Sequence, residues 1–324
     1  RSEEPSPERT DKLEAAEDKL DELKDQQDAL AAEKETIITT FGDLMRVPGS
    51  GSSLQGEKAK GADVRIVYAT FDALAIAREN PDKRVIFLGV GFETTAPTVA
   101  AAMVSARQMN LNNFFVYSAH KIVPPALDAL MQGGATGIDG FILPGHVSVI
   151  IGLEAYRPFF ERYRTPCAVA GFEPADLLAG IAHLVDQIES GTPQLANTYP
   201  RAVTAAGNPK ARRIIEDVFT VADATWRGIG PIPASGLAIN EEYAPFDVRN
   251  TIDLPAEDVP EPAGCACGAI LTGTQTPPEC PLYKTRCNPI HPVGPCMVSS
   301  EGTCAAYYRY HSDDGPSGES EAQP

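Results

Sequence analysis

Cysteines crowd into one end of this 324-residue chain. Six of the seven lie between Gly264 and Ala305, with the spacing C-x-C-x12-C-x6-C-x8-C-x7-C. The surrounding sequence is rich in Gly and Pro and holds too few large apolar residues to build a core of its own. Something other than hydrophobic burial must therefore hold this segment together.

Three kinds of cross-link are open to this array: disulfides, a structural zinc ion or an iron-sulfur cluster. Disulfides are typical of small secreted domains, but the rest of the chain has only Cys167 and no signal-peptide pattern, which favours a cytoplasmic protein. Zinc sites usually carry paired C-x2-4-C knuckles, whereas Cys265 and Cys267 are separated by a single residue. Four thiolates at irregular spacing hold a [4Fe-4S] cluster and would leave two cysteines as a redox dithiol, the interpretation we favour.

Charge and hydropathy exclude two classes of partner. The net charge of -17 argues against nucleic acid, and no apolar run approaches the roughly 18 residues that span a bilayer, so no membrane segment is predicted. Residues 1–36 hold 6 basic and 13 acidic residues, a net charge of -7. Residues 312–324 have a net charge of -4 and are predicted to form a disordered acidic tail.

The acidic N-terminal segment, residues 1–36, has the pattern of a coiled-coil-like helix. Apolar or neutral residues fall on the a and d positions of a heptad repeat: Leu13, Ala16, Leu20, Leu23, Gln27 and Leu30. Ala16 and Gln27 weaken this seam. The segment is therefore either a single exposed helix or a helix through which the protein self-associates.

Residues 37–190 alternate between short apolar runs and helical patterns. The expected strands are Val64–Ala69, Val85–Val90, Phe114–Tyr117, Gly140–Leu143 and Cys167–Gly171. The expected helices are Phe71–Glu79, Ala96–Met109, Pro124–Met131, Leu153–Tyr163 and Asp176–Ile188. This order predicts an α/β fold with parallel sheets covered by helices on both faces. Residues 191–262 read as a helix (Asn208–Phe219) and a Pro/Gly-rich connection, and residues 263–311 as the cysteine-rich domain.

Polar motifs follow several of these strands, where ligands of parallel α/β sheets bind. Glu93 stands at one strand end, followed by Thr94 and Thr95, and the motif is either a turn with a capping threonine or part of a cleft. His120 and His146 follow the next two strands, so they are expected to converge on one crevice.

Three further positions carry simpler expectations. Asp43 and Arg46 either form a local salt bridge or line the cleft. Cys167 is expected to be a buried, inert thiol. His183, inside an apolar helix, is expected to be a packing residue.

The residues around the cysteines are more specific than their spacing. From Cys265 the chain reads CACGAILTGTQTPPECPLYKTRCNPIHPVGPCMVSSEGTCAAYY, which resembles the C-terminal signature of the HypD family of hydrogenase maturation proteins. TFGDLMRVPGS (Thr40 to Ser50), GFETTAPT (Gly91 to Thr98), GFILPGHVSVIIG and WRGIGPIPASGL are also similar to that family. The resemblance covers about Thr39 to Tyr310.

The resemblance implies a scaffold on which the Fe(CN)2CO group of [NiFe]-hydrogenase is assembled. Iron would be held together with a HypC-type chaperone, and cyanide would come from a HypE-type partner. Glu93, Thr94, Thr95, His120 and His146 would belong to the cleft, and Glu93 would carry a proton or orient a ligand. By similarity to ferredoxin:thioredoxin reductase, the [4Fe-4S] ligands would be Cys265, Cys280, Cys287 and Cys296, with Cys267 and Cys304 as the dithiol.

The chain departs from the family pattern ahead of TFGD. HypD proteins carry a Cys-Gly-Gly-His-x-His stretch and a Gly-Pro-Gly-Cys-Pro-x-Cys stretch there, and their cysteines include the thiol that holds the mononuclear iron. Neither stretch occurs here, so one α/β domain is expected to be incomplete. Two alternatives therefore stand beside the scaffold: a non-catalytic remnant or interaction protein with a structural metal site, and a thiol-disulfide reductase.

Overall fold

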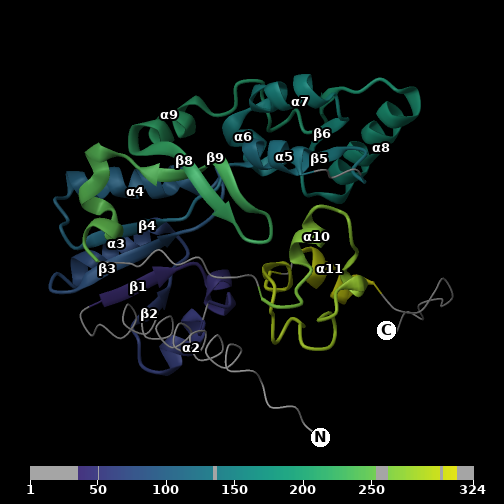
Figure 1. Ribbon diagram of the computed structural model, residues 1–324. Helices are drawn as coiled ribbons and strands as arrows, with labels where there is room; N and C mark the ends of the chain where they lie inside the picture. The colour runs from purple at the N-terminus through teal and green to yellow at the C-terminus, as the bar shows by residue number, and fades with distance from the viewer. Residues whose placement is uncertain (1–35, 50, 134–136, 253–261, 300–301, 312–324) are drawn as a thin grey trace, which may run out of the picture.

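The computed structural model describes residues 36–49, 51–133, 137–252, 262–299 and 302–311. Within these ranges the chain forms two parallel sheets, a two-stranded hairpin and the cysteine-rich segment (Figure 1). The predicted N-terminal helix, apart from Thr36, and the predicted acidic tail lie outside the described residues. None of the helices in these ranges has both the length and the apolar character needed to cross a bilayer.

The first sheet has four parallel strands in the order β2-β1-β3-β4. They are β1 (Thr36–Thr40), β2 (Val64–Ile66), β3 (Arg84–Gly89) and β4 (Phe114–Ser118). Its helices are η1 (Gly42–Arg46), α2 (Leu54–Ala59), α3 (Thr70–Glu79) and α4 (Ala96–Gln108). Neighbouring residues of β1 enter different apolar clusters, because Ile37 packs with α3 and α4 whereas Ile38 packs with Met45 and Val248. Both faces of this sheet are therefore covered, as predicted for parallel strands.

The second sheet has three parallel strands in the order β5-β6-β7. They are β5 (Phe141–Pro144), β6 (Cys167–Ala170) and β7 (Leu195–Asn197). Its helices are α5 (Val123–Gln132), α6 (Gly145–Ile151), η2 (Leu153–Tyr156), α7 (Arg157–Tyr163) and α8 (Pro174–Ser190). Leu143, Cys167 and Val169 pack against Tyr156 and Phe159 to form its core. Cys167 is fully buried, as the sequence predicted.

A hairpin joins the two sheet units where the sequence predicted an irregular connection. It follows α9 (Pro209–Val218) and consists of β8 (Phe219–Trp226) and β9 (Gly230–Ile239), with a bulge between Ala222 and Ala224. In Figure 1 the hairpin runs between the two units: α9 packs on α4, and β9 packs on α5. The helix predicted over Asn208–Phe219 is confirmed as α9, with Asn208 as its N-cap and Phe219 as its C-cap, and Phe219 also begins β8.

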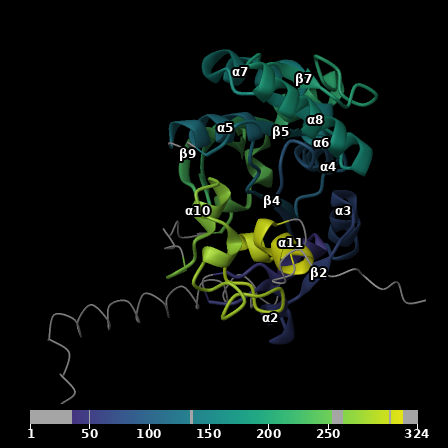
Figure 2. The same ribbon diagram turned by 90° about the vertical axis from the view of Figure 1, so that its right-hand side faces the viewer.

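The cysteine-rich segment has little regular structure. It contains α10 (Cys267–Leu271), η5 (Pro277–Glu279), η6 (Pro295–Met297) and α11 (Thr303–Tyr310). Figures 1 and 2 place it beyond the tip of the hairpin. Ahead of it, η3 (Glu241–Phe246) and η4 (Val248–Asn250) cover the outer edge of β4, where Asp247 forms a bridge with Val116.

Candidate functional site

The turn after β3 carries Glu93 into the interior. Gly91 has a φ of +142°, and a Cβ there would lie 2.2 Å from Thr95 Oγ1, so this turn requires glycine. Glu93 is 4% exposed, and its Oε1 accepts a hydrogen bond from the Val123 amide at the start of α5 (2.9 Å). Its Oε2 is buried and has no hydrogen-bond partner among the described residues. Glu93 thus caps one helix and presents a second oxygen with an unused lone pair.

Glu93 lines a pocket of about 620 Å³ between the two sheet units. The wall is mostly apolar, with residues from α5, α9, η2 and the hairpin, including Ile122, Pro124, Ile215 and Leu237. Burial raises the pKa of Glu93 to about 7, although the hydrogen bond from Val123 opposes this. At neutral pH the carboxyl group therefore exchanges a proton readily, which suits a proton carrier.

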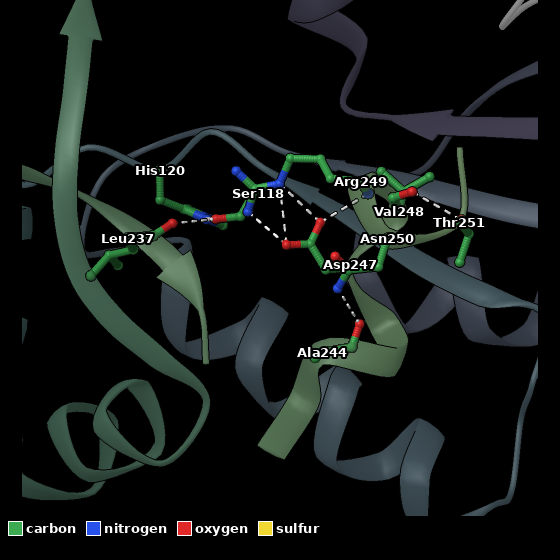
Figure 3. A network of polar contacts seen from close by, with 9 residues as sticks. All are labelled: Ser118, His120, Leu237, Ala244, Asp247, Val248, Arg249, Asn250 and Thr251. Atoms are coloured by element: carbon green, nitrogen blue, oxygen red, sulfur yellow. Dashed lines mark hydrogen bonds and ion pairs between the residues drawn. The ribbon is translucent and has the colours of Figure 1, made fainter. Parts of the chain in front are cut away.

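His120 lies under the hairpin at the tip of the neighbouring strand β4 (Figure 3). Ser118 Oγ gives its single proton to the Leu237 carbonyl (2.8 Å), so it must accept from His120 Nδ1–H (3.1 Å). His120 Nε2 is then an acceptor, buried without a hydrogen-bond partner among the described residues. Burial, aided by the charge of Lys121, lowers the pKa of His120 to about 4 and keeps the ring neutral.

The other residues predicted to act at strand ends are Thr94, Thr95 and His146. Thr95 occupies the residue before α4, but its hydroxyl donates to the Phe92 carbonyl (3.1 Å) and does not cap the helix, while Thr94 is half-buried in the same turn. His146 is exposed, and its ring packs on Phe172 with centroids 4.7 Å apart. Because β4 and β5 belong to different sheets, His120 and His146 do not lie at neighbouring strand ends of one sheet, and their convergence on one crevice stays a prediction.

Two exposed residues of η1, Asp43 and Arg46, do not line the pocket beside Glu93. No ion pair joins them among the residues that the structure describes, so the predicted local salt bridge does not form. The loop that follows them is held instead by Arg227, whose Nη1 donates to the Pro48 carbonyl (3.1 Å).

The tip of the hairpin contacts both the turn after β3 and the cysteine-rich segment. The Trp226 ring lies 5.9 Å from the Phe92 ring, and its Nε1 donates to Ser235 Oγ (2.8 Å). Gly228 has a φ of +86°, and a Cβ there would lie 3.5 Å from Cys267 Sγ. A Cβ on Gly268 would lie only 2.3 Å from the Gly228 carbonyl oxygen, so both glycines are needed for this close approach. The motif that contains Trp226 was recognised in the sequence, but its residues were not predicted to form strands.

The six C-terminal cysteines converge on one apolar cluster. Cys267, Cys280, Cys287, Cys296 and Cys304 are buried in it with Met297, and Cys265 packs against it. None of the seven cysteines of the chain forms a disulfide.

The sulfur atoms of three of these cysteines are neighbours. Cys296 Sγ lies 3.1 Å from Cys304 Sγ and also interacts with Cys267. The Cys267 hydrogen bond lowers the pKa of Cys296, but the hydrogen bond with Cys304 and burial outweigh it and raise this pKa to about 12.

The donor set of this cluster is six soft thiols, the kind of donor that both zinc and iron-sulfur clusters use. A tetrahedral zinc ion with bonds of about 2.3 Å holds its sulfurs within roughly 3.8 Å of one another. In the described part of the chain, no three Cys, His, Asp or Glu side chains converge closely enough to hold one ion. Soft thiols spread around a shared apolar centre are the donors that iron-sulfur clusters use, and Cys287 Sγ already accepts the Val293 amide (3.3 Å).

Comparison with known proteins decides the family. The sequence model of HypD, described as the hydrogenase formation hypA family, matches residues 21–311. The chain belongs to the HypD family. The HypD hydrogenase maturation factor of Escherichia coli is 44% identical over 286 residues, which cover 88% of this chain and 77% of that protein. The HypD factor of Cupriavidus necator is 43% identical over 289 residues (87% and 76%).

A hydrogenase expression/formation protein of Methanocaldococcus jannaschii is also similar, with 44% identity over 274 residues that cover 85% of this chain and 76% of that protein. The HypD match includes both sheets, the hairpin and the whole cysteine-rich segment. It also begins inside the predicted N-terminal helix, so part of that segment belongs to the HypD sequence pattern. About a quarter of each of these relatives lies outside the matched region.

Proposed function

We propose that this HypD-family protein is a scaffold for hydrogenase maturation, on which the Fe(CN)2CO group of [NiFe]-hydrogenase is assembled as cargo. We further propose that its cysteine-rich segment holds a redox-active [4Fe-4S] cluster. The observation that carries the proposal is the convergence of six cysteines on one buried cluster beside the hairpin. When bound, such a cluster supplies single electrons.

The ligands proposed for the cluster are Cys265, Cys280, Cys287 and Cys296. The dithiol would be Cys267 and Cys304, and both contact the sulfur of Cys296. In its disulfide form this pair would lie beside a cluster ligand, where it could accept two electrons, passed one at a time through the cluster from an external reductant, and two protons to become the dithiol. Cys296 would then be the cluster ligand that contacts both cysteines of the redox pair.

Glu93 and His120 would serve the cargo as buried proton-handling groups. Glu93 exchanges its proton near neutral pH, and His120 presents a neutral acceptor at Nε2. Thr94 and Thr95 would shape the turn that holds Glu93, whereas His146, on the other unit, would act from the opposite sheet. Asp43 and Arg46, the other proposed binding residues, would contribute from η1, outside the pocket beside Glu93.

The proposed partners are a HypC-type chaperone and a HypE-type cyanide donor in the cytoplasm. Membership of the HypD family supports this proposal, because the relatives are hydrogenase maturation factors. Purified HypC-type chaperone should be retained by the immobilised full chain at micromolar concentration. A chain that carries its iron and sulfide but does not retain the chaperone would contradict this part of the proposal.

The cluster is tested by anaerobic purification followed by iron and sulfide analysis. We expect a brown protein with broad visible absorbance and roughly four irons per chain. Cys280→Ser should lose most of this iron. Cys167→Ala is the matched control, because Cys167 is buried in the second sheet unit and should leave the iron content unchanged. Folded, colourless protein without iron after reconstitution would refute the proposed cluster.

One observation favours a second candidate function, thiol-disulfide exchange. Cys296 and Cys304 have sulfurs 3.1 Å apart, close enough for a disulfide to form after a small movement. Redox titration with a defined thiol-disulfide buffer, read by thiol alkylation and mass spectrometry, would reveal a two-electron couple. Iron-free protein that shows such a couple, lost in Cys304→Ser, would favour a reductase over the scaffold.

A further inference from the structure

Three consecutive residues at the end of the β8–β9 hairpin contact three separate segments of the chain. The Trp226 ring packs against Phe92 in the turn after β3, with centroids 5.9 Å apart. Arg227 Nη1 donates to the Pro48 carbonyl in the loop after η1 (3.1 Å). Gly228 lies against α10 of the cysteine-rich segment (Figure 1). We define Trp226, Arg227 and Gly228 as the hairpin tip. A displacement of this short piece of backbone would therefore reach all three segments.

The contact between the hairpin tip and α10 has no slack. A Cβ on Gly268 would lie 2.3 Å from the Gly228 carbonyl oxygen, so the two backbones touch directly. Cys267 and Gly268 are the first two residues of α10, and a helical turn moves them together. Cys267 is buried, and a Cβ on Gly228 would lie 3.5 Å from its sulfur. Because close-packed contacts transmit displacement, a shift of Cys267 must also shift Gly228 or open this contact.

Cys267 has to shift when it forms a disulfide. Cys267 and Cys304 both contact the sulfur of Cys296, and none of the cysteines is bonded to another. Contacting thiols stand well apart, as the 3.1 Å between the sulfurs of Cys296 and Cys304 shows, whereas a disulfide bond is about 2.05 Å long. Oxidation of the Cys267 and Cys304 pair therefore draws the two residues together by on the order of 1 Å.

At the other end of the hairpin tip, Trp226 is held firmly enough to act on the turn that carries Glu93. Its Nε1 donates to Ser235 Oγ (2.8 Å), and the fully buried Ser235 donates in turn to the Ile232 carbonyl (2.7 Å). Phe92, which Trp226 contacts, directly precedes Glu93, and the Phe92 carbonyl accepts the first amide of α4 (3.3 Å). A change in the contact between Trp226 and Phe92 therefore changes the support of the Glu93 turn.

We propose that the hairpin tip couples the oxidation state of Cys267 to the turn that carries Glu93 and to the loop at Pro48. The coupling rests on the redox pair of the proposed function. In the dithiol form the tip is docked on α10, as in this structure. When the disulfide forms, the thiols of Cys267 and Cys304 lose two electrons and two protons, α10 moves and its contact with Gly228 opens. The scaffold thus holds its buried carboxyl firmly only while the redox pair is reduced.

The test compares the reduced and oxidised full chain after anaerobic reconstitution with iron and sulfide. Glutathione disulfide is the oxidant, which takes up the two electrons and two protons and becomes two molecules of glutathione. Alkylation and mass spectrometry identify the oxidised cysteines. Amide exchange is followed in residues 89–96 and 44–49, and emission of Trp226, the only tryptophan, is a second readout. We expect exchange in both segments to be about threefold faster or more in the oxidised chain.

Four variants separate the coupling from oxidation itself. Cys304→Ser, outside the proposed ligand set, should keep its iron and show no response to the oxidant. Trp226→Leu should form the disulfide but lose the response of the turn after β3. Arg227→Ala, at an exposed position, should lose only the response of the loop after η1. Thr225→Ala, an exposed neighbour on β8, is the matched control and should respond like the wild type.

Four outcomes would overturn the proposal. A disulfide between Cys267 and Cys304 without faster exchange in either segment would end the coupling but leave the redox pair intact. Failure of Cys267 to form any disulfide would end both. Responses of wild-type size in Trp226→Leu and Arg227→Ala would show that the movement takes another route. Faster exchange only in chains that have lost their iron would assign the change to loss of the cluster and not to the disulfide.

Discussion

Replacing Glu93 with Gln should remove a specific dependence of stability on pH. Burial raises the pKa of this carboxyl from 4.5 to about 7, so the folded chain holds a proton that the unfolded chain has released. The resulting stabilisation is complete below about pH 4.5 and is lost as the pH rises through about 7. At about 1.36 kcal/mol per pKa unit, the wild type loses about 3 kcal/mol over this range relative to a neutral side chain.

Gln is a suitable replacement because it stays neutral and its Oε1 can still accept the Val123 amide. We therefore expect the unfolding free energy of Glu93→Gln, minus that of the wild type, to rise by about 3 kcal/mol between pH 4.5 and 7.5. Denaturant unfolding followed by fluorescence measures this difference, because Trp226 is the only tryptophan and contacts Phe92 beside Glu93.

Glu154→Gln provides the control from the same pocket. Arg157 beside Glu154 lowers the pKa of that carboxyl, so this variant should show no gain in relative stability as the pH rises. If the difference in unfolding free energy between Glu93→Gln and the wild type does not change over this pH range, the reasoning is refuted, because Glu93 would then have the same pKa in the folded and unfolded chains. A falling difference would show that Glu93 is held as a carboxylate.

Three further outcomes are expected. His120, with its pKa lowered to about 4, should show no titration of its ring by NMR between pH 5 and 8. The unfolding free energy should fall by about 3 kcal/mol as the pH drops from 6.5 to 4, because the buried ring resists protonation. An NMR titration midpoint near pH 6.5 would contradict this. Gly268→Ala should speed amide exchange across residues 262–299 but not in the first sheet, because the added Cβ meets the Gly228 carbonyl. Equal changes in exchange rate in both regions would show that this contact does not hold the cysteine-rich segment. Ser235→Ala should lower the unfolding free energy by about 1 kcal/mol, because the Nε1–H of half-buried Trp226 loses its acceptor, and an unchanged denaturation midpoint would exclude that role.

Five of the seven strands in the two parallel sheets could be located from the sequence because they are short apolar runs between helical patterns, whereas β1 and β7 were not predicted as strands. β3, β4, β5 and β6 lie within two residues of their predicted ends. The predicted strand from Val64 stops at Ile66, and the predicted helix from Leu153 is divided into η2 and α7. α6 was missed because its β-branched residues have strand propensity, which contacts with the rest of the fold override.

The hairpin could not be predicted because β9 contains Pro231 and Pro233, which argue against a central strand. A two-stranded ribbon accepts them, since each strand has one free edge. His183 illustrates a related error. Both flanks of α8 contain apolar residues, but only Gly180, Leu184 and Gln187 of its later turns are buried, and His183 is exposed. Which flank of an apolar helix meets the sheet depends on the tertiary arrangement.

The hairpin also explains why the candidate site could be only partly predicted. Strand ends placed Glu93 and His120 correctly at the carboxyl edge of one sheet, but the hairpin, through Phe219 and Leu237, helps to bury His120, and the hairpin tip reaches the cysteine-rich segment. Trp226 and Gly228 are two residues apart, so the contact with Phe92 and the contact with Cys267 share one short piece of backbone. Because Gly228 and Gly268 meet backbone to backbone, the cysteine-rich segment cannot shift along the hairpin without disturbing this turn. The position of Cys267 relative to the pocket is therefore set by the register of β8 and β9.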